Sequence, residues 1–275
     1  MKVAILFICT GDYWRFWEGF RQSADKFFMT DCEKSYFVFS DKSRVDFSGA
    51  DIVVPQDNLG WPLNTLQRFR MFGRIKSELS TFDRLVFLNA NCQFLKPISG
   101  IEFFGQDTDI VACHHPGFFN KQPEQFTYER RLDSTAHVSD GKVYVAGGLM
   151  GGTSTAFIKA CEELDQNIES DFDKGLLALW HDESHWNAFI NQRASALGLR
   201  VHFLNPSYLY PEGWHIPFEP RILLREKSAL INVQKIKGTR HGAVTTQTGA
   251  ALHRRVAKRI WTWLKAKPFT NSTHR

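Results

Sequence analysis

The sequence lacks any apolar run long enough to cross a membrane as a helix. Such a span needs about 18 consecutive apolar residues, and the first run, residues 3–9, ends at Thr10-Gly11-Asp12. We therefore expect a buried strand there, and neither a signal peptide nor a transmembrane helix. Cysteine is also scarce, with five scattered residues and no Cys-X-X-Cys. This pattern argues against a disulfide framework and a structural zinc site, and it fits a reducing compartment.

Acidic residues are nearly absent from the last part of the chain. From Arg225 to the end there are twelve Lys or Arg and a single acid, Glu226, so this part carries +11 while the whole chain carries +5. The preceding 224 residues therefore carry −6. The basic character belongs to the tail and needs its own explanation. Because no nucleic-acid-binding motif accompanies it, we expect no nucleic acid among the partners.

What the sequence does contain is an alternation of strand and helix patterns. Strands are predicted at residues 3–9, 36–39, 52–54 and 85–88, and helices at residues 14–29 and 63–79. With 43% hydrophobic residues, including 24 Phe, the chain can fill one sizeable core. The alternation predicts an α/β fold with a parallel sheet covered by helices, in which ligands bind beyond the carboxyl ends of the strands.

The middle of the chain is richer in loops. A strand is predicted at residues 110–113, and helices at residues 153–170 and 183–197. Between them, residues 144–152 contain four glycines. Glycine permits tight turns or a close approach of two backbones, and we expect one of these here.

The last part of the chain divides into a polar linker, residues 228–248, and a basic amphipathic tail, residues 249–275. Leu252, Val256 and Ile260 fall on one helical face of the tail, with basic residues largely elsewhere. Such a helix is typical of peripheral contact with anionic membrane. A solvated tail, or a helix docked on the domain, is the alternative.

Two short motifs carry polar groups suited to chemistry. Asn89-Ala90-Asn91 follows a buried strand directly; asparagine is a poor ligand for a hard cation but can hydrogen-bond to phosphate or sugar oxygens, and such a motif is also a turn signal. Asp182 and Glu183 lie between His181 and His185. The two acids can favour a helix start, or one can face a developing oxocarbenium ion. The spacing is not that of a His-Glu-X-X-His zinc site.

In order and spacing, several segments resemble the family 6 glycosyltransferases, which include the histo-blood-group A and B transferases and the α1,3-galactosyltransferase. The resembling segments are His115-Pro116-Gly117-Phe118, residues 126–131, Gly147-Gly148 with Gly151-Gly152, and residues 180–184 with Asn187. Asn89-Ala90-Asn91 and residues 208–214 look like the bacterial, metal-independent branch of that family, whose other members have Asp-X-Asp. The resemblance implies a GT-A type nucleotide-binding fold, with a mixed, mostly parallel sheet flanked by helices, over residues 1–227.

The family also implies an activity. It is the transfer of GalNAc or Gal from UDP-GalNAc or UDP-Gal, in α1,3 linkage and with retention, to a β-galactoside acceptor that we expect to be α1,2-fucosylated. Glu183 resembles the catalytic carboxylate. The residues implied to bind the acceptor are His115, Thr127, Trp180 and Glu212. The residues implied to bind the donor are Phe7, Cys9, Tyr13, Arg68, Asn89, Ala90, Asn91, Ala146, Gly147, Gly148, Asp182, Arg225 and Lys227.

Two departures from the mammalian pattern bear on these expectations. Without carboxylates at Asn89-Ala90-Asn91, we expect no metal and no other cofactor, and protein cations must stabilise the UDP leaving group; Arg68, Arg225 and Lys227 are the candidates. Gly148 leaves room for an N-acetyl group, as in the GalNAc-using relatives, which favours UDP-GalNAc. Ala146 differs from both blood-group enzymes, so UDP-Gal stays open.

The vertebrate relatives carry a membrane anchor and a stem, whereas this sequence starts at its first predicted strand. We therefore expect a cytoplasmic protein, peripheral on the inner membrane face, that acts on a lipid-linked or lipopolysaccharide-type glycan. Loss of the Asp-X-Asp carboxylates leaves one alternative from another class. The chain could be an inactive transferase fold that only binds carbohydrate.

Overall fold

A computed structural model describes residues 1–234, the side chain of Val45 excepted. Within these residues a seven-stranded sheet has the order β3-β2-β1-β4-β7-β6-β8. Its strands are β1 (Lys2–Ile8), β2 (Glu33–Ser40), β3 (Ile52–Pro55), β4 (Arg84–Leu88), β6 (Ile110–His114), β7 (Val145–Thr153) and β8 (Val201–Leu204). Four pairings are parallel and the two made by β7 are antiparallel. The predicted mixed, mostly parallel sheet flanked by helices is thus confirmed.

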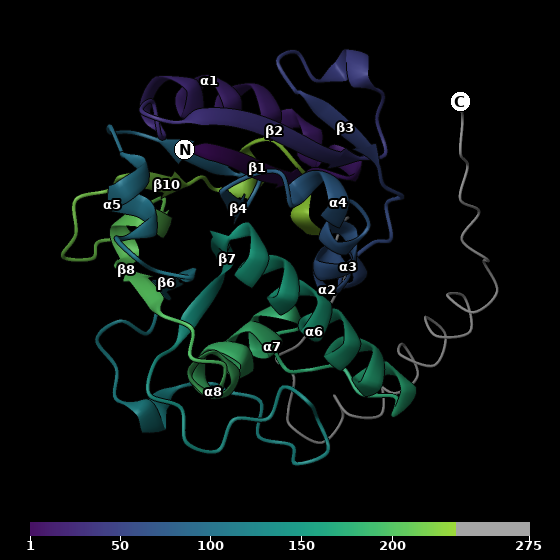
Figure 1. Cartoon of the computed structure of the whole chain (residues 1–275), viewed down its shortest axis with the longest axis vertical. Helices are drawn as coiled ribbons and strands as arrows, with labels where there is room; N and C mark the ends of the chain where they lie inside the picture. Colours follow the sequence, from purple (N-terminus) through teal and green to yellow (C-terminus); the bar gives the residue numbers. More distant parts are fainter. Residues whose placement is uncertain (235–275) are drawn as a thin grey trace.

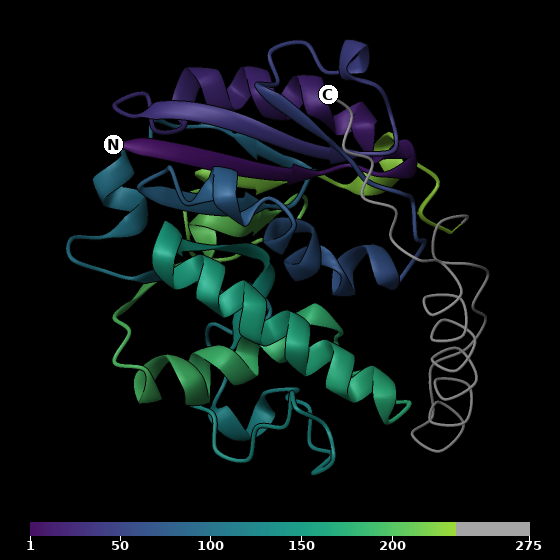
Figure 2. The ribbon, with the colours of Figure 1, turned by 45° about the vertical axis from the view of Figure 1, so that its right-hand side comes forward.

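Helices cover both faces of the sheet (Figures 1 and 2). They are α1 (Trp17–Phe27), α2 (Leu63–Leu66), α3 (Arg68–Gly73), α4 (Lys76–Leu79), α5 (Gly100–Phe104), α6 (Ser154–Asp173), α7 (Asp182–Ala188) and α8 (Ala194–Ala196). Successive side chains of a strand point to opposite faces, so β1 contributes to two cores. Its odd-numbered residues pack with α1 in one core, and its even-numbered residues pack with α3 and α6 in the other.

The glycine-rich residues 144–152 form most of β7, a central strand, and not a turn. Within β7, Gly151 and Gly152 face neighbouring backbones so closely that a Cβ would clash with the carbonyl oxygens of Leu85 and Asp109. The expected close backbone approach is confirmed, while the alternative of a tight turn is wrong. Four glycines lower the β-propensity of a segment, so the pattern alone does not reveal the strand.

Two predicted helices are interrupted. The helix expected at residues 63–79 is divided into α2, α3 and α4, with breaks at Gln67 and Ile75. The apolar stripe was read correctly, because Leu66, Phe69 and Leu79 are buried. Gly73 and Ile75 favour helix weakly, and this lets the chain break there. The helix expected at residues 183–197 consists of α7, a π-helical turn (Phe189–Arg193) and α8.

A small second sheet brings the end of the described chain back to β4. It contains β5 (Cys92–Phe94), β10 (Ile222–Leu224) and β9 (Tyr210–Pro211), in the order β5-β10-β9. The backbone N–H of Arg225 donates to the Asn91 carbonyl oxygen at 2.8 Å. Residues far apart in the sequence therefore meet at the carboxyl end of β4.

Most of the predicted linker and all of the predicted tail, residues 249–275, lie outside the described residues. The expectation of an amphipathic membrane contact there stays a prediction. Among the helices of residues 1–234, none combines the length and the apolar character that a membrane span requires.

Candidate active site

A pocket of about 600 Å³, part of it open to solvent, lies beyond the carboxyl ends of β1 and β4. This is where ligands bind in sheets of this kind. It is lined by six residues that the sequence assigns to donor binding: Tyr13, Arg68, Asn89, Ala90, Asn91 and Lys227. Segments from four parts of the chain thus converge on one cavity.

Hydrogen bonds to backbone carbonyl oxygens fix Asn89-Ala90-Asn91 just beyond the carboxyl end of β4. Asn89 N donates to Gly148 O at 2.9 Å. The Asn91 side-chain amide donates to Arg225 O, whereas its Oδ1 is buried and finds no hydrogen-bond partner within the described chain. The group that Asn91 leaves for a ligand is therefore an acceptor, suited to a sugar or ribose hydroxyl.

Arg68 and Asp182 form a buried ion pair beside this pocket. Arg68 Nη1 lies 3.0 Å from Asp182 Oδ2, and both side chains are less than a tenth exposed. The same Nη1 donates to Gly147 O, and the guanidinium lies over the Phe87 ring, 4.3 Å from its centroid. Burial raises the pKa of Asp182, while Arg68 acts in the opposite direction. The pair thus holds Asp182 in one place.

Glu183 accepts two hydrogen bonds at its carboxylate. Gly147 N donates to Oε2 at 2.8 Å, and the Tyr144 hydroxyl donates to Oε1 at 3.2 Å. Burial raises the pKa of Glu183 to about 7, the hydrogen bond from Gly147 lowers it, and the charge of Asp182 raises it further. Strongly perturbed carboxylates in a cleft are typical of catalytic groups.

The residue before these two carboxylates has an unusual backbone. His181 has φ 56° and ψ −126°, a left-handed conformation that is strained for any residue with a side chain. Its ring contacts Trp61 edge to face, with centroids 5.0 Å apart. The strain lies at the turn that directs Asp182 and Glu183 toward β7.

The residues predicted to bind the acceptor connect to Glu183 through a chain of hydrogen bonds. Trp180 Nε1 donates to Thr127 Oγ1 at 3.0 Å, and Thr127 donates to the Tyr144 hydroxyl at 3.4 Å. Tyr144 in turn donates to Glu183. The His115 ring packs on Tyr144, with centroids 5.7 Å apart. The structure thus brings His115, Thr127 and Trp180 together around Tyr144.

Tyr144 is a residue of the site that sequence reasoning missed. It joins the carboxylate to the acceptor side, but the sequence shows it only as the residue before a glycine-rich run. Six residues that line the pocket were also missed: Ile8, Thr10, Trp61, Asn64, Thr65 and Phe87.

Three other predicted site residues, Phe7, Cys9 and Glu212, lie in different surroundings. Phe7 and Cys9 are fully buried in the core and do not line the pocket, and Phe7 packs against Trp17 and Phe20. Glu212 accepts from the side chain of Arg225 at 3.4 Å and from Glu226 N at 2.7 Å.

The three cations predicted to stabilise the UDP leaving group lie in different positions relative to the pocket. Arg68 and Lys227 line the pocket, while the Arg225 guanidinium contacts Glu212 and Gln93. Arg68 is ion-paired with Asp182. Lys227 places its Nζ 5.6 Å from the centroid of the Tyr13 ring. Of the three, Arg68 and Lys227 are the cations that face the pocket.

The segment Ala146-Gly147-Gly148 lies between the pocket and the carboxylates. A Cβ at Gly147 would lie 3.0 Å from the Glu183 Cβ, and a Cβ at Gly148 would lie 2.7 Å from Asn89 Nδ2. A larger residue at position 148 would have to displace Asn89. Ala146 is buried.

The donor set at this site suits sugar and phosphate oxygens better than a metal ion. Across residues 1–234, no three His, Cys, Asp or Glu side chains are grouped so that they could hold a metal. The amide groups at the mouth of β4 are weak ligands for a hard cation. The amides of Asn89 and Asn91 offer a divalent metal no charged ligand, and the expectation that the protein needs no metal stays a prediction.

These features together define a class of protein. Parallel strands ending at a pocket are typical of nucleotide binding, and a buried carboxylate beside that pocket is suited to glycosyl chemistry. A GT-A-like fold that combines both is that of a glycosyltransferase, with a nucleotide-sugar donor and a glycan acceptor.

The chain belongs to glycosyltransferase family 6, whose sequence profile matches residues 1–229, and the family supports α1,3 transfer by a hexosyltransferase. It is 31% identical to the O-antigen biosynthesis glycosyltransferase WbnI of Escherichia coli, over 82% of this chain and 95% of that protein. It is 28% identical to globoside α-1,3-N-acetylgalactosaminyltransferase 1 of Gallus gallus, over 86% and 69%. It is 27% identical to histo-blood group ABO system transferase 1 of Rattus norvegicus, over 71% and 58%. The predicted family is confirmed.

Proposed function

We propose that the chain transfers GalNAc from UDP-GalNAc, with retention, in α1,3 linkage to a β-galactoside that carries α1,2-fucose, and that it needs no divalent metal. The observation that carries this proposal is the position of Glu183. Its carboxylate is held by Gly147 N and Tyr144, between the donor pocket and the residues assigned to the acceptor. An ionised Glu183 would either attack the anomeric carbon or stabilise the oxocarbenium ion, and both roles need the negative charge.

The preference for GalNAc over Gal rests on Gly148. Without a side chain at this position, Asn89 can lie directly against β7. The Asn89 amide and Leu209 occupy the space beside Gly148, so an N-acetyl group would enter here by displacing the Asn89 side chain, to which it could then hydrogen-bond. UDP-Gal, which lacks this group, is the second candidate donor.

Metal independence rests on the groups around the diphosphate. Departure of UDP leaves negative charge that must be stabilised, and Lys227 lines the pocket together with Asn89 and Asn91. Lys227 would supply the positive charge, and the asparagines would supply hydrogen bonds to the donor. Arg68 contributes less, because Asp182 already balances its charge.

A donor screen tests the whole proposal. The full chain is incubated with UDP-GalNAc or UDP-Gal, with EDTA or Mn²⁺, and with galactosides with and without α1,2-fucose; the linkage is read by NMR. We expect α1,3-linked GalNAc product at an undiminished rate in EDTA. Loss of transfer in EDTA would contradict metal independence, and a faster reaction with UDP-Gal would reverse the donor assignment.

An inactive carbohydrate-binding protein is the alternative from another class. It predicts neither product nor release of UDP with any of these donors and acceptors. The retained pair Asp182 and Glu183, buried and held by hydrogen bonds, favours the enzyme.

Membrane contact through residues 249–275 also stays a proposal. If it holds, truncation after Thr248 should abolish co-sedimentation with anionic vesicles.

A further inference from the structure

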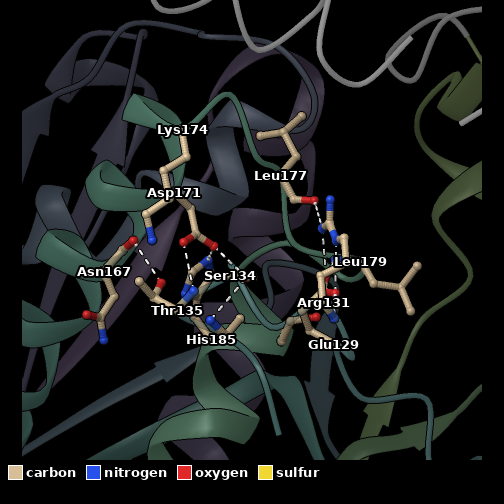
Figure 3. Close-up of polar contacts among 12 residues, drawn as sticks. Glu129, Arg131, Ser134, Thr135, Asn167, Asp171, Lys174, Leu177, Leu179 and His185 are labelled. Carbon is tan, nitrogen blue, oxygen red and sulfur yellow. Dashed lines mark hydrogen bonds and ion pairs between the residues drawn. The ribbon is translucent and has the colours of Figure 1, made fainter. Parts of the chain in front are cut away.

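The segment from Glu129 to Thr135 lies against residues 177–179, which lead into helix α7 (Figure 3). Two of its charged residues, Glu129 and Arg131, form an ion pair that the donor and acceptor assignments leave without a role. Glu129 is only 3% exposed. A buried carboxylate needs full hydrogen bonding, so the partners of Glu129 show what it holds in place.

Glu129 binds the backbone just before Trp180. Leu179 N donates to Glu129 Oε2 at 2.8 Å. Arg131 donates to both carboxylate oxygens, from Nε at 3.0 Å and from Nη2 at 2.6 Å. Arg131 Nη2 also donates to Leu177 O. One carboxylate–guanidinium pair thus contacts the 177–179 backbone at two points, a donor and an acceptor.

The charge state of Glu129 suits this role. Burial raises the pKa of its carboxyl, but the hydrogen bonds and the charge of Arg131, together with the hydrogen bond from Leu179 N, lower the pKa below its ordinary value. Glu129 is therefore ionised at neutral pH, and hydrogen bonds to ionised groups are about twice as strong as those between neutral groups.

The far end of the same segment has a separate anchor. Asp171, at the end of α6, accepts from Ser134 Oγ at 2.6 Å and from Thr135 N at 2.8 Å. Thr135 Oγ1 donates to Asn167 O at 2.9 Å. The segment is thus attached to α6 without Glu129, and we expect variants of Glu129 to fold.

Both partners of the Trp180–Thr127 hydrogen bond lie close in the sequence to Glu129 or to Leu179, which Glu129 binds. Trp180 directly follows Leu179, and Thr127 lies two residues before Glu129. Trp180 is 47% exposed. On the side of α7, its N–H donates to Ser184 Oγ at 2.9 Å and its carbonyl oxygen accepts from Glu183 N at 3.1 Å. A shift of the 177–179 backbone would therefore carry the indole away from Thr127.

We propose that Glu129, fixed by Arg131, is a positioning residue that holds the Trp180 indole against Thr127 and so sets the affinity for the β-galactoside acceptor. This inference rests on the proposed function, because that function assigns Trp180 and Thr127 to the acceptor. Glu129 does not touch the donor pocket, so donor affinity should not depend on it.

The test is a double-mutant cycle of Glu129→Gln and Trp180→Ala in the full chain. The dissociation constants of fucosyllactose, the lactose whose galactose carries α1,2-fucose, with UDP present, and of UDP alone are measured by titration calorimetry. Glu129→Gln should weaken fucosyllactose binding about tenfold and leave UDP binding within about twofold. In the Trp180→Ala background, Glu129→Gln should have little further effect, since it acts through Trp180.

Glu163→Gln is the matched control, because Glu163 also pairs with an arginine, Arg193, but on the outer side of α6. It should leave both dissociation constants unchanged. If Glu129→Gln does not fold, Arg131→Gln replaces it, since the Arg131 side chain is 39% exposed and its loss keeps the bond from Leu179 N.

Unchanged fucosyllactose binding in a folded variant, or the same loss in both backgrounds, would overturn the role of Glu129. An equal loss of UDP affinity would show a general structural role instead. Wild-type protein that binds no fucosyllactose would also overturn it. Wild-type protein that binds fucosyllactose but transfers no sugar would contradict only the proposed function, because the cycle reads binding alone.

Discussion

The donor side and the acceptor side of the site are built by different means. Around the pocket, β1, β2, β3 and β4 run in parallel. Asn89 directly follows β4, and Tyr13 lies in the 3-10 helix (Gly11–Phe16) that follows β1. On the acceptor side, His115, Thr127 and Trp180 lie on loops that side-chain hydrogen bonds hold together. Glu183 stands between them, bound to a backbone N–H of β7 and to the hydroxyl of Tyr144.

This difference implies a division of tasks. A site built on sheet ends is rigid because moving it would break the sheet ladder, which suits the donor nucleotide. A site on loops depends on a few side chains, each of which can be changed without unfolding the sheet. Acceptor choice should therefore change more readily than donor binding, and the following variants test this.

The largest effect should come from Glu183→Gln, at the junction of the two sides. The variant keeps the shape but removes the charge that the transition state requires, so kcat should fall at least about 10³-fold. UDP binding, measured by calorimetry, should persist. Turnover near that of the wild type would remove Glu183 from the mechanism.

Asp182→Asn tests the rigidity of the donor side. It leaves the buried Arg68 guanidinium without its ionic partner, and breaking a buried pair costs about 3 kcal/mol or more. Urea unfolding should show this loss in the free energy of unfolding. The exposed pair of Lys76 and Glu162 provides the control, since Glu162→Gln should cost less than about 1 kcal/mol. Equal losses in the two variants would contradict the difference in burial.

Tyr144→Phe tests the link to the acceptor side and should have the smallest effect. It removes one hydrogen bond to an ionised group, worth about 1.5 kcal/mol, or roughly tenfold in kcat. Because the pKa of Glu183 is raised to about 7, the wild-type kcat/KM should fall as the pH drops below that value and the carboxylate becomes protonated. The hydrogen bond from Tyr144 lowers this pKa, so Tyr144→Phe should move the acid limb to higher pH. A limb that does not move would show that Tyr144 is not bonded to Glu183 in solution.

The same division decides how much the sequence alone can predict. Parallel strands leave continuous apolar runs, so β1, β4 and the place of Asn89-Ala90-Asn91 beyond β4 could be predicted from the pattern. The contact of Tyr144 with Glu183, and that of Asn91 with Arg225, join residues that no local pattern connects. Phe7 shows a further limit. Both faces of β1 lie in a core, and the apolar run alone does not show that the Phe7 side chain is turned away from the pocket.

For the glycines of β7, the sequence correctly predicted a close backbone approach but did not predict the strand in which it occurs. Their lack of side chains was read correctly as permission for close backbone approach. That approach occurs inside the sheet, against Leu85 and Asp109, and not at a turn. Here the tertiary context outweighs the weak strand propensity of glycine.

The backbone conformation of His181 affects how selection for stability would act on the active site. Its left-handed backbone costs about 1–3 kcal/mol that glycine would not. A search for thermal stability alone would therefore favour glycine at this position, and with it a looser turn before Asp182 and Glu183 and no ring against Trp61. We therefore expect a directed-evolution experiment scored on heat resistance alone to replace His181 by glycine early, and turnover to fall as a result.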